Sequence, residues 1–332
     1  MQRSPSLLLL VVALFSVGCQ WLPKIPVQPS PTPSAAPTQP VVGRIYVTDR
    51  DSRVLAIRTD QDLVAERFPV EDGAGGVATS PDGLFLYATA KTKDYLRIFQ
   101  TSGALVGRLG TGKEPAGIDI SRDGSRLYVA NKGDDTISVL DPRHRKSLKT
   151  IPTGHQPMAV AVSNNGKMLY VLAHADNEVL AYDASSGKEK ARATVPTGPF
   201  SLALDPKGKY LYVSSFDANQ VSVLDTSTLA EVAVVKVGDG AYDLVASRDG
   251  QIYVSCVEEG AVVQFPYEDW SSEPKATPVG SRPYGLALSA DESQLFVALE
   301  GDSRLAVLSL PGLQNKTSLD LGVIPVDVFN GR

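Results

Sequence analysis

Three aspartates, Asp119, Asp243 and Asp327, stand where most equivalent segments of the chain carry glycine or alanine. Each lies in a short aliphatic segment that predicts a β-strand. A carboxylate at such a position would ligate calcium or accept a hydrogen bond from a substrate, because calcium prefers oxygen ligands. The three aspartates fall in different segments and at different depths along their strands, so the sequence does not imply that they form one site.

A second group of candidate residues is aromatic. Several segments share a Gly-x-x-Pro signature, and the positions that follow its proline, or the residue replacing that proline, are Gly75, Ala116, Met158, Phe200, Tyr242, Tyr284 and Val326. Phe200, Tyr242 and Tyr284 come from three consecutive segments, and Phe216 could join them from a loop. Aromatic residues are enriched where binding energy concentrates, so this cluster predicts contact with a peptide or ligand. The alternative is that the rings fill space between neighbouring segments.

Motifs of known enzymes are absent from the chain. Its three histidines are His144, His155 and His174. His155 and His174 could be neighbours, but two histidines without a nearby acidic or cysteine cluster fall short of a catalytic zinc site. The sequence also lacks a Gly-x-Ser-x-Gly turn, a phosphate-binding glycine-rich loop and a Cys-x-x-Cys-His haem attachment motif. It therefore favours binding over catalysis. It predicts no cofactor, apart from a divalent cation such as calcium at the acidic positions.

A repeat positions these candidate residues. An aromatic residue followed by valine or alanine recurs every 41 to 43 residues, at Tyr46, Tyr87, Tyr128, Tyr170, Tyr212, Tyr253 and Phe296. A turn such as Asn164-Asn165-Gly166 precedes most copies, and turns of this composition join antiparallel strands. One aliphatic strand precedes the turn, and two more strands follow the aromatic strand. Four short strands per repeat, without helical periodicity, are typical of one β-propeller blade.

Seven copies predict an all-β fold, a seven-bladed β-propeller over residues 43–332. The repeated unit resembles the YVTN family of propeller repeats, and Tyr46-Val47-Thr48-Asp49 and Tyr128-Val129-Ala130-Asn131 carry the resemblance best. The resemblance implies the fold. The family includes surface-layer and secreted proteins, and related propellers include lactonases and quinoprotein subunits, so the resemblance implies no single function.

The repeats do not start and finish together. Residues 323–329 predict one more first strand, whereas the unit that contains Tyr46 has no such strand before it. We therefore expect the C-terminal strand, residues 323–329, to complete the first blade, which continues over residues 44–70. This arrangement would close the ring and leave no unpaired edge at that point.

The N-terminal residues predict export. Residues 1–18 have the pattern of a secretory signal peptide, and their apolar run is shorter than the roughly 20 residues of a membrane span. The residues before Cys19 resemble the lipobox of bacterial lipoproteins, with Ser16 where that family usually has leucine. The resemblance implies that Cys19 is acylated and becomes the new N-terminus. Residues 19–42 would then form a lipid-anchor cysteine and a proline-rich, semi-rigid spacer.

Together these patterns predict an exported, membrane-anchored lipoprotein of the cell envelope, on the outer membrane if the cell has one, and otherwise a secreted protein. The net charge of -5 argues against nucleic acid as a partner. We expect a monomer that binds an envelope or extracellular protein, a glycan or a small ligand through its loop face. The alternative is a metal-dependent enzyme of the lactonase or lyase type, with acidic residues at the channel.

Overall fold

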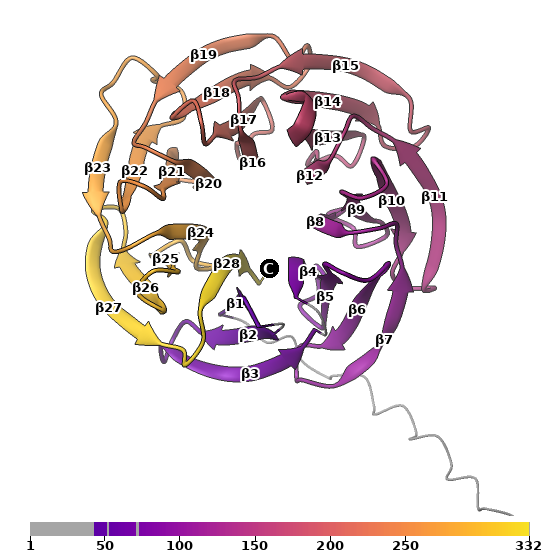
Figure 1. Ribbon diagram of the computed structural model, residues 1–332, viewed down its shortest axis with the longest axis horizontal. Helices are drawn as coiled ribbons and strands as arrows, with labels where there is room; N and C mark the ends of the chain where they lie inside the picture. The colour runs from indigo at the N-terminus through magenta and orange to yellow at the C-terminus, as the bar shows by residue number, and fades with distance from the viewer. Residues whose placement is uncertain (1–42, 52, 71–72, 332) are drawn as a thin grey trace, which may run out of the picture. The chain divides into compact units, whose positions relative to one another are not determined.

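The computed structural model describes residues 43–51, 53–70 and 73–331. These residues form seven four-stranded antiparallel sheets, arranged as blades around a central channel (Figure 1). The prediction of an all-β, seven-bladed β-propeller is confirmed. We number the blades 1 to 7 around the ring, and blade 1 contains the first strand of the chain.

Within each blade the strands run from the channel to the outer wall. The innermost strands, from blade 1 to blade 7, are β28 (Pro325–Asn330), β4 (Ala74–Thr79), β8 (Pro115–Ile120), β12 (Pro157–Val162), β16 (Pro199–Leu204), β20 (Ala241–Ala246) and β24 (Pro283–Leu288). The second strands are β1 (Arg44–Asp49), β5 (Phe85–Ala90), β9 (Leu127–Asn131), β13 (Met168–Ala173), β17 (Tyr210–Ser215), β21 (Gln251–Cys256) and β25 (Gln294–Leu299).

The outer half of each blade follows the same order. The third strands are β2 (Arg53–Arg58), β6 (Tyr95–Gln100), β10 (Thr136–Asp141), β14 (Glu178–Asp183), β18 (Gln220–Asp225), β22 (Ala261–Pro266) and β26 (Arg304–Ser309). The outermost strands are β3 (Leu63–Pro69), β7 (Leu105–Gly110), β11 (Lys146–Pro152), β15 (Glu189–Thr194), β19 (Glu231–Lys236), β23 (Lys275–Pro278) and β27 (Gln314–Asp320). One short 3-10 helix, η1 (His174–Asp176), follows β13. Nowhere in the described chain is there a helix long and apolar enough to cross a membrane.

The C-terminal strand closes the ring. β28 pairs antiparallel with β1, so that Tyr46 lies opposite Phe329 and Val47 opposite Val328. In Figure 1 the last strand therefore lies beside the first, although they are at opposite ends of the chain. This confirms the sequence-based expectation for residues 323–329. The predicted signal peptide, the lipid-anchor Cys19 and the spacer lie outside the described residues.

The predicted turns join the first and second strands. Gly83, Gly124 and Gly166 have φ angles of 69°, 68° and 69°, a region that glycine enters without a steric penalty. In the first of these turns the Ser80 hydroxyl donates a hydrogen bond of 2.5 Å to Asp82. Where the turn reads Ser-x-Asp-Gly, in blades 2, 3 and 6, the serine hydroxyl bonds to the aspartate in this way and helps to fix the tight reversal.

The hydrophobic core consists of clusters that each lie between two adjacent blades. One joins blades 5 and 6 around Tyr212 and Phe265, and another joins blades 7 and 1 around Phe296 and Ile45. The recurring aromatic of the second strand is buried, as Tyr212 and Tyr253 illustrate. Burying aromatic side chains of this size between blades is a main source of the free energy that holds the ring together.

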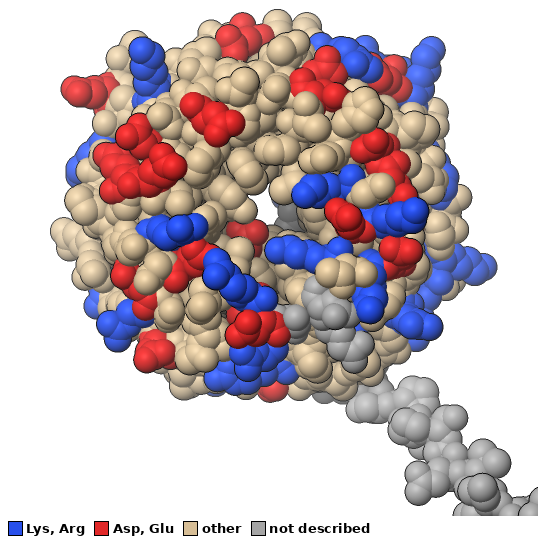
Figure 2. All heavy atoms as spheres, viewed as in Figure 1, with Lys and Arg blue, Asp and Glu red and all other residues tan. Residues whose placement is uncertain are grey.

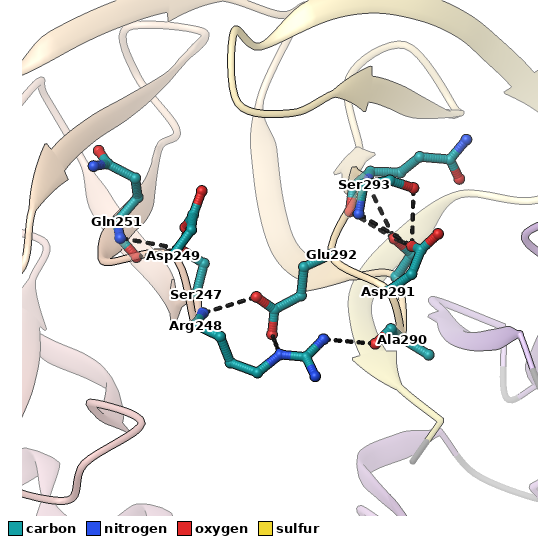
Figure 3. Close-up of polar contacts among 10 residues, drawn as sticks. Ser247, Arg248, Asp249, Gln251, Ala290, Asp291, Glu292 and Ser293 are labelled. Atoms are coloured by element: carbon teal, nitrogen blue, oxygen red, sulfur yellow. Dashed lines mark hydrogen bonds and ion pairs between the residues drawn. The ribbon is translucent and has the colours of Figure 1, made fainter.

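Polar contacts add to the packing at the face of the ring opposite the site described below. Arg248, in the first turn of blade 6, donates from its backbone N–H and from Nε to Glu292 in blade 7, both at 2.7 Å (Figure 3). Its Nη2 also donates to the carbonyl oxygen of Ala290 at 2.8 Å. One arginine thus joins two neighbouring turns.

Candidate active site at the channel mouth

The channel mouth is the end of the channel at which the innermost strands begin. A β-bulge in these strands shapes it. In blade 6 the pairing of β20 with β21 stops after Ala241 and resumes at Leu244, so that Tyr242 and Asp243 lie outside the regular ladder. Both side chains are partly exposed, because a bulge redirects side chains and here it turns them to the channel. The register between β28 and β1 shifts in the corresponding part of blade 1.

Hydroxyl groups on the second strands satisfy the backbone N–H groups that the bulges release. The N–H of Asp243 donates to Ser255 Oγ at 3.0 Å, and the N–H of Asp327 donates to Thr48 Oγ1 at 3.2 Å. Backbone donors in such partly buried positions need a partner, so these bonds hold both aspartates in place. Strands, rather than loops, therefore position the two carboxyl groups.

Asp243 and Asp327 occupy the same position, the third residue of the innermost strand, on blades 6 and 1. Gly285 has that position on blade 7, between them. Asp243 Oδ2 accepts a hydrogen bond of 2.8 Å from the N–H of Leu286, also in blade 7. Its Oδ1 accepts one of 2.7 Å from the hydroxyl of Ser201 in blade 5. The Asp243 carboxylate therefore links three blades.

Asp327 approaches blade 7 from the other side. A Cβ atom on Gly285 would lie 2.5 Å from Asp327 Oδ1 and 2.5 Å from its Cα. We find no hydrogen bond to the Asp327 carboxyl group in the described part of the chain. The two carboxyl groups thus flank one glycine, and we call Asp243 and Asp327 the carboxyl pair.

The environment of the carboxyl pair disfavours two negative charges. Burial raises the pKa of both groups, and the negative charge of Asp243 raises the pKa of Asp327 further. Both side chains keep partial exposure because they face the channel. Two carboxyl groups that repel each other share one proton in the neutral range. Asp243, which accepts several hydrogen bonds, carries the charge, and Asp327 carries the proton.

Asp119 lies apart from the pair. It is the fifth residue of β8, and its Oδ2 accepts a hydrogen bond of 2.8 Å from the N–H of Val162 in blade 4. This carboxylate joins two blades and lies further into the channel. Asp243 and Asp327 lie at equal depth, which corrects the expectation of different depths for these two residues.

Tyr242, one position before Asp243, forms part of an aromatic cluster. The ring centroids of Phe200 and Tyr242 are 4.9 Å apart, and those of Tyr242 and Tyr284 are 4.8 Å apart. Phe216 lies 5.9 Å and His174 lies 4.9 Å from Phe200, again between ring centroids. We call these five residues the aromatic arc. All are partly exposed, so the structure brings together the four aromatic residues that the sequence singled out and adds His174.

The aromatic arc is coupled electrostatically to the carboxyl pair. Burial raises the pKa of the Tyr242 hydroxyl, and the charges of Asp327 and Asp243 raise it further. The hydroxyl therefore stays protonated throughout the physiological range. It is available as a neutral hydrogen-bond donor beside the two carboxyl groups.

Cations gather on the other side of the mouth. Glu300, with a side chain only 10% exposed, forms an ion pair of 2.9 Å with Arg282 and another with Arg50. Arg282 Nη2 donates a hydrogen bond of 2.7 Å to the hydroxyl of Tyr284. Arg50, Tyr284, Glu300 and Lys91 all line a cavity of about 470 Å³.

We call the residues that directly follow the second strands the rim of the channel mouth, and their types change in a regular order around the ring. The residues directly after the second strands, in order from blade 1 to blade 7, are Arg50, Lys91, Lys132, His174, Phe216, Val257 and Glu300. Blades 1 to 3 thus place a positively charged side chain at the channel mouth, and blades 4 and 5 place an aromatic side chain there. Figure 2 shows the central opening with Lys and Arg side chains near it around β4, β8 and β28, and uncharged residues beside β16 and β20.

The histidines have separate partners. His174 Nδ1 donates a hydrogen bond of 2.8 Å to the carbonyl oxygen of Pro199, so that Nε2 is the ring nitrogen that does not take part in this bond. His155 Nδ1 is 2.9 Å from Asp176, and His144 Nδ1 is 2.9 Å from Asp141. Within residues 43–51, 53–70 and 73–331, no group of three or more histidine, cysteine or acidic residues is arranged to hold a metal ion.

Sequence reasoning did not single out Arg50, Lys91, Arg282 or Glu300. These residues stand in loops of mixed charge, where no single sign dominates. The signal that would have found three of them is their shared offset of four residues from the recurring aromatic of the second strand.

A closed ring of seven four-stranded blades places the chain among the seven-bladed β-propellers. Residues 123–328 match the family model of the cytochrome D1 heme domain, so the chain belongs to this family. Residues 45–147 match the model of the lactonase family, described as a 7-bladed beta-propeller. The comparison with curated protein sequences finds no match.

Solved structures share the fold at low sequence identity. The periplasmic gluconolactonase PpgL of Pseudomonas aeruginosa aligns with a TM-score of 0.71 and 16% identity, over 86% of this chain and 98% of that one. A putative 6-phosphogluconolactonase from Bacteroides uniformis aligns with a TM-score of 0.70 and 16% identity, over 86% and 99% of the two chains. The dihydro-heme d1 dehydrogenase NirN aligns with a TM-score of 0.66 and 18% identity, over 85% and 66%.

These findings correct the functional expectation from sequence. The expectation of a binding or scaffolding module that is not an enzyme is wrong, because residues 45–147 match the lactonase family model and the similar folds include named lactonases. They favour the alternative, a lactonase-like propeller enzyme. The physical reason for the error is that the catalytic groups of such a site come from separate blades and leave no compact motif in the sequence.

Proposed function

We propose that this protein is a hydrolase of the lactonase type, which opens a cyclic ester at the carboxyl pair. The observation that carries the proposal is the shared position of Asp243 and Asp327 on either side of Gly285, where burial and the charge of Asp243 raise the pKa of Asp327 and favour its protonated form. The match of residues 45–147 to the lactonase family supports it. That segment contains Arg50 and Lys91 of the rim.

The carboxyl pair can supply both proton transfers of ester hydrolysis. The Asp243 carboxylate takes a proton from a water molecule as the water oxygen bonds to the lactone carbonyl carbon. The bond between that carbon and the ring oxygen then breaks, and Asp327 gives its proton to the ring oxygen. The product is a hydroxy acid, which releases one proton to solvent, and the pair again holds one proton.

Tyr242 completes the site on this proposal. Its hydroxyl is protonated and lies in the field of the carboxyl pair, so it can donate a hydrogen bond to the carbonyl oxygen as negative charge develops there.

The test measures acid release from D-glucono-1,5-lactone by the full-length chain in detergent, with and without chelator, at pH 6.5. We expect the variant Asp327→Asn to lose activity by about 100-fold, in the range for loss of a general acid. Asp51→Asn, which removes an exposed carboxylate from the same face, is the matched control and should keep the wild-type rate. Opening no faster than the spontaneous rate, or full activity in Asp327→Asn, would reject the proposal.

A second candidate function is haem binding at the same mouth, because the chain belongs to the cytochrome D1 heme domain family. His174 could serve as an axial ligand through Nε2, since the bond of Nδ1 to Pro199 fixes the ring. The aromatic arc offers partly exposed rings that are tilted against one another, and Arg50 and Lys91 could pair with the carboxylates of the macrocycle. Bound haem would supply a redox-active iron.

Absorption titration of the full-length chain with haem tests this candidate. Binding with a shifted absorption band that is lost in His174→Ala and kept in His155→Ala supports it. His155 is a suitable control because it is exposed and bonded to Asp176. Equal spectra for wild type and His174→Ala would reject it.

The location of the enzyme is a further part of the proposal. We propose that residues 1–18 are removed, that Cys19 is acylated, and that residues 19–42 hold a monomeric propeller away from the membrane as a spacer. The YVTN resemblance supports an exported protein. Incorporation of labelled palmitate that disappears in Cys19→Ser would support the anchor, and equal labelling of both would reject it.

A further inference from the structure

A cavity lies beside the carboxyl pair, and Val326, the residue before Asp327, is part of its lining. It has a volume of about 470 Å³ and lies at blades 1, 2 and 7, where Arg50, Lys91, Tyr284 and Glu300 contribute to its wall. Lys91 is close enough to act on Asp327, because its positive charge opposes the rise in the pKa of that carboxyl group. A group bound by Lys91 would therefore lie next to the reacting atoms.

Most charges at the cavity are already compensated. Asp49 forms an ion pair of 2.8 Å with Arg53. Glu300 is held between Arg50 and Arg282, which leaves one positive charge in that group of three. The carboxyl pair contributes one negative charge, because it keeps one proton. The net positive charge of Arg50, Glu300 and Arg282 and the negative charge of the carboxyl pair therefore balance one another.

Lys91 is the exception. Its side chain is exposed, and within the described chain its ammonium group has no hydrogen bond or ion pair to another side chain. Lys132 has the equivalent position on blade 3 but does not line this cavity. Among the described residues, the Lys91 ammonium group therefore has no hydrogen-bond or ion-pair partner at the cavity, and a ligand with a single negative charge would neutralise it.

Tyr284 provides the other half of the recognition. Its ring forms part of the cavity wall, and its hydroxyl accepts a hydrogen bond of 2.7 Å from Arg282. The Arg282 guanidinium also lies 5.6 Å from the centre of the ring. The ring is thus held in one orientation, and it offers a flat face to the C–H groups of a substrate ring.

We propose that the substrate is a lactone that carries one carboxylate, which Lys91 binds while the lactone ring lies against Tyr284. This inference rests on the proposed lactonase function and adds the class of substrate. A neutral lactone would leave Lys91 without a partner. A phosphorylated lactone would bring a second negative charge next to the carboxyl pair.

The test compares two lactones that differ at one carbon. D-glucaro-1,4-lactone carries a carboxylate where D-glucono-1,4-lactone carries a hydroxymethyl group, and 6-phosphogluconolactone supplies the doubly charged case. With the full-length chain we expect the highest kcat/KM for the glucaro compound. Lys91→Met should lower the ratio of kcat/KM for the glucaro compound to kcat/KM for the glucono compound about tenfold, as expected for loss of a close charge pair, because any effect on Asp327 is common to both substrates. Lys132→Met makes the same change in charge on the same face and should have little effect.

The outcomes separate this inference from the proposed function. A preference for the neutral or the phosphorylated lactone would overturn the inference while the hydrolase remains. Equal effects of Lys91→Met and Lys132→Met would overturn it as well, because only the general field of the rim would then matter. If no lactone is opened, calorimetry with the product D-glucarate decides. Binding that is weakened in Lys91→Met alone supports the carboxylate site without the hydrolase, and no difference between D-glucarate and D-gluconate overturns it.

Discussion

Asp243 and Asp327 come from blades 6 and 1 and contact two consecutive residues of blade 7, Leu286 and Gly285 respectively. Asp243 accepts a hydrogen bond of 2.8 Å from the N–H of Leu286, and Asp327 Oδ1 lies 2.5 Å from the position that a Cβ on Gly285 would take. Asp327 belongs to β28, the strand that closes the ring. The candidate site is therefore complete only when the first and last strands have paired, so that folding and function depend on one event.

The two members of the carboxyl pair should respond differently to substitution by asparagine. Asp243 accepts hydrogen bonds from Ser201, Leu244 and Leu286, and an amide has only one acceptor oxygen, so Asp243→Asn leaves a partly buried donor unsatisfied. We expect it to lower the free energy of unfolding by about 1–3 kcal/mol. Asp327→Asn, whose carboxyl group makes no such bonds, should retain the wild-type stability at pH 5. Urea unfolding of both variants at that pH checks this, and equal losses would contradict it.

Stability should fall as the pH rises through the neutral range. The pKa of Asp327 is raised in the folded protein by burial and by Asp243, whereas the unfolded chain has the ordinary value near 4. The folded state therefore binds more protons above that value, and the free energy of unfolding decreases until the folded group has also ionised. Asp327→Asn removes this dependence, so it should be more stable than wild type at pH 9. Thermal unfolding between pH 5 and pH 9 measures the difference, and parallel curves for the two proteins would refute the argument.

The fold could be predicted from sequence because its determinants are local and repeated. Each copy carries its own aromatic strand and glycine turn, and the spare strand at residues 323–329 indicated how the ring closes. The aromatic arc was also accessible, because alignment at the Gly-x-x-Pro proline placed Phe200, Tyr242 and Tyr284 in one column. Equivalent positions in a repeat become neighbours around a ring.

The carboxyl pair was harder to predict, although the same alignment holds the signal. Asp327 is two residues after Pro325, and Asp243 is two residues after Ala241, which replaces the proline in blade 6. Asp119 is four residues after its proline and so lies deeper. Sequence alone could not show the bulge that turns the third residue to the channel, or that Gly285 leaves space between two charges. Both depend on packing between blades, which a single repeat does not record.

Gly285 should be intolerant of a side chain. A Cβ atom there would lie 2.5 Å from Asp327 Cα and 2.5 Å from the backbone nitrogen of Val328, and backbone atoms cannot move aside as a flexible side chain can. We expect Gly285→Ala to cost about 1–3 kcal/mol of stability, the usual penalty for overpacking, and to reduce activity by displacing Asp327. Gly110→Ala is the control, because a Cβ at Gly110 would have no neighbour within 4 Å. Similar melting temperatures for the two variants would show that blades 7 and 1 are less tightly packed than the structure indicates.

Closure by β28 should dominate the stability of the whole ring. Removing residues 323–332 leaves the inner edge of β1 unpaired and takes away Val328, which is 97% buried in the cluster between blades 7 and 1. We expect this truncation to lose most of the stability, because unpaired edges and exposed apolar faces remain on both sides of the gap. Val328→Asp tests the same contact without shortening the chain, and a buried unpaired charge should also lower the melting temperature strongly. Calorimetry of both variants decides the matter. An unchanged transition in either would mean that the ring holds without its last strand, and Asp327 would then need another explanation for its position beside Gly285.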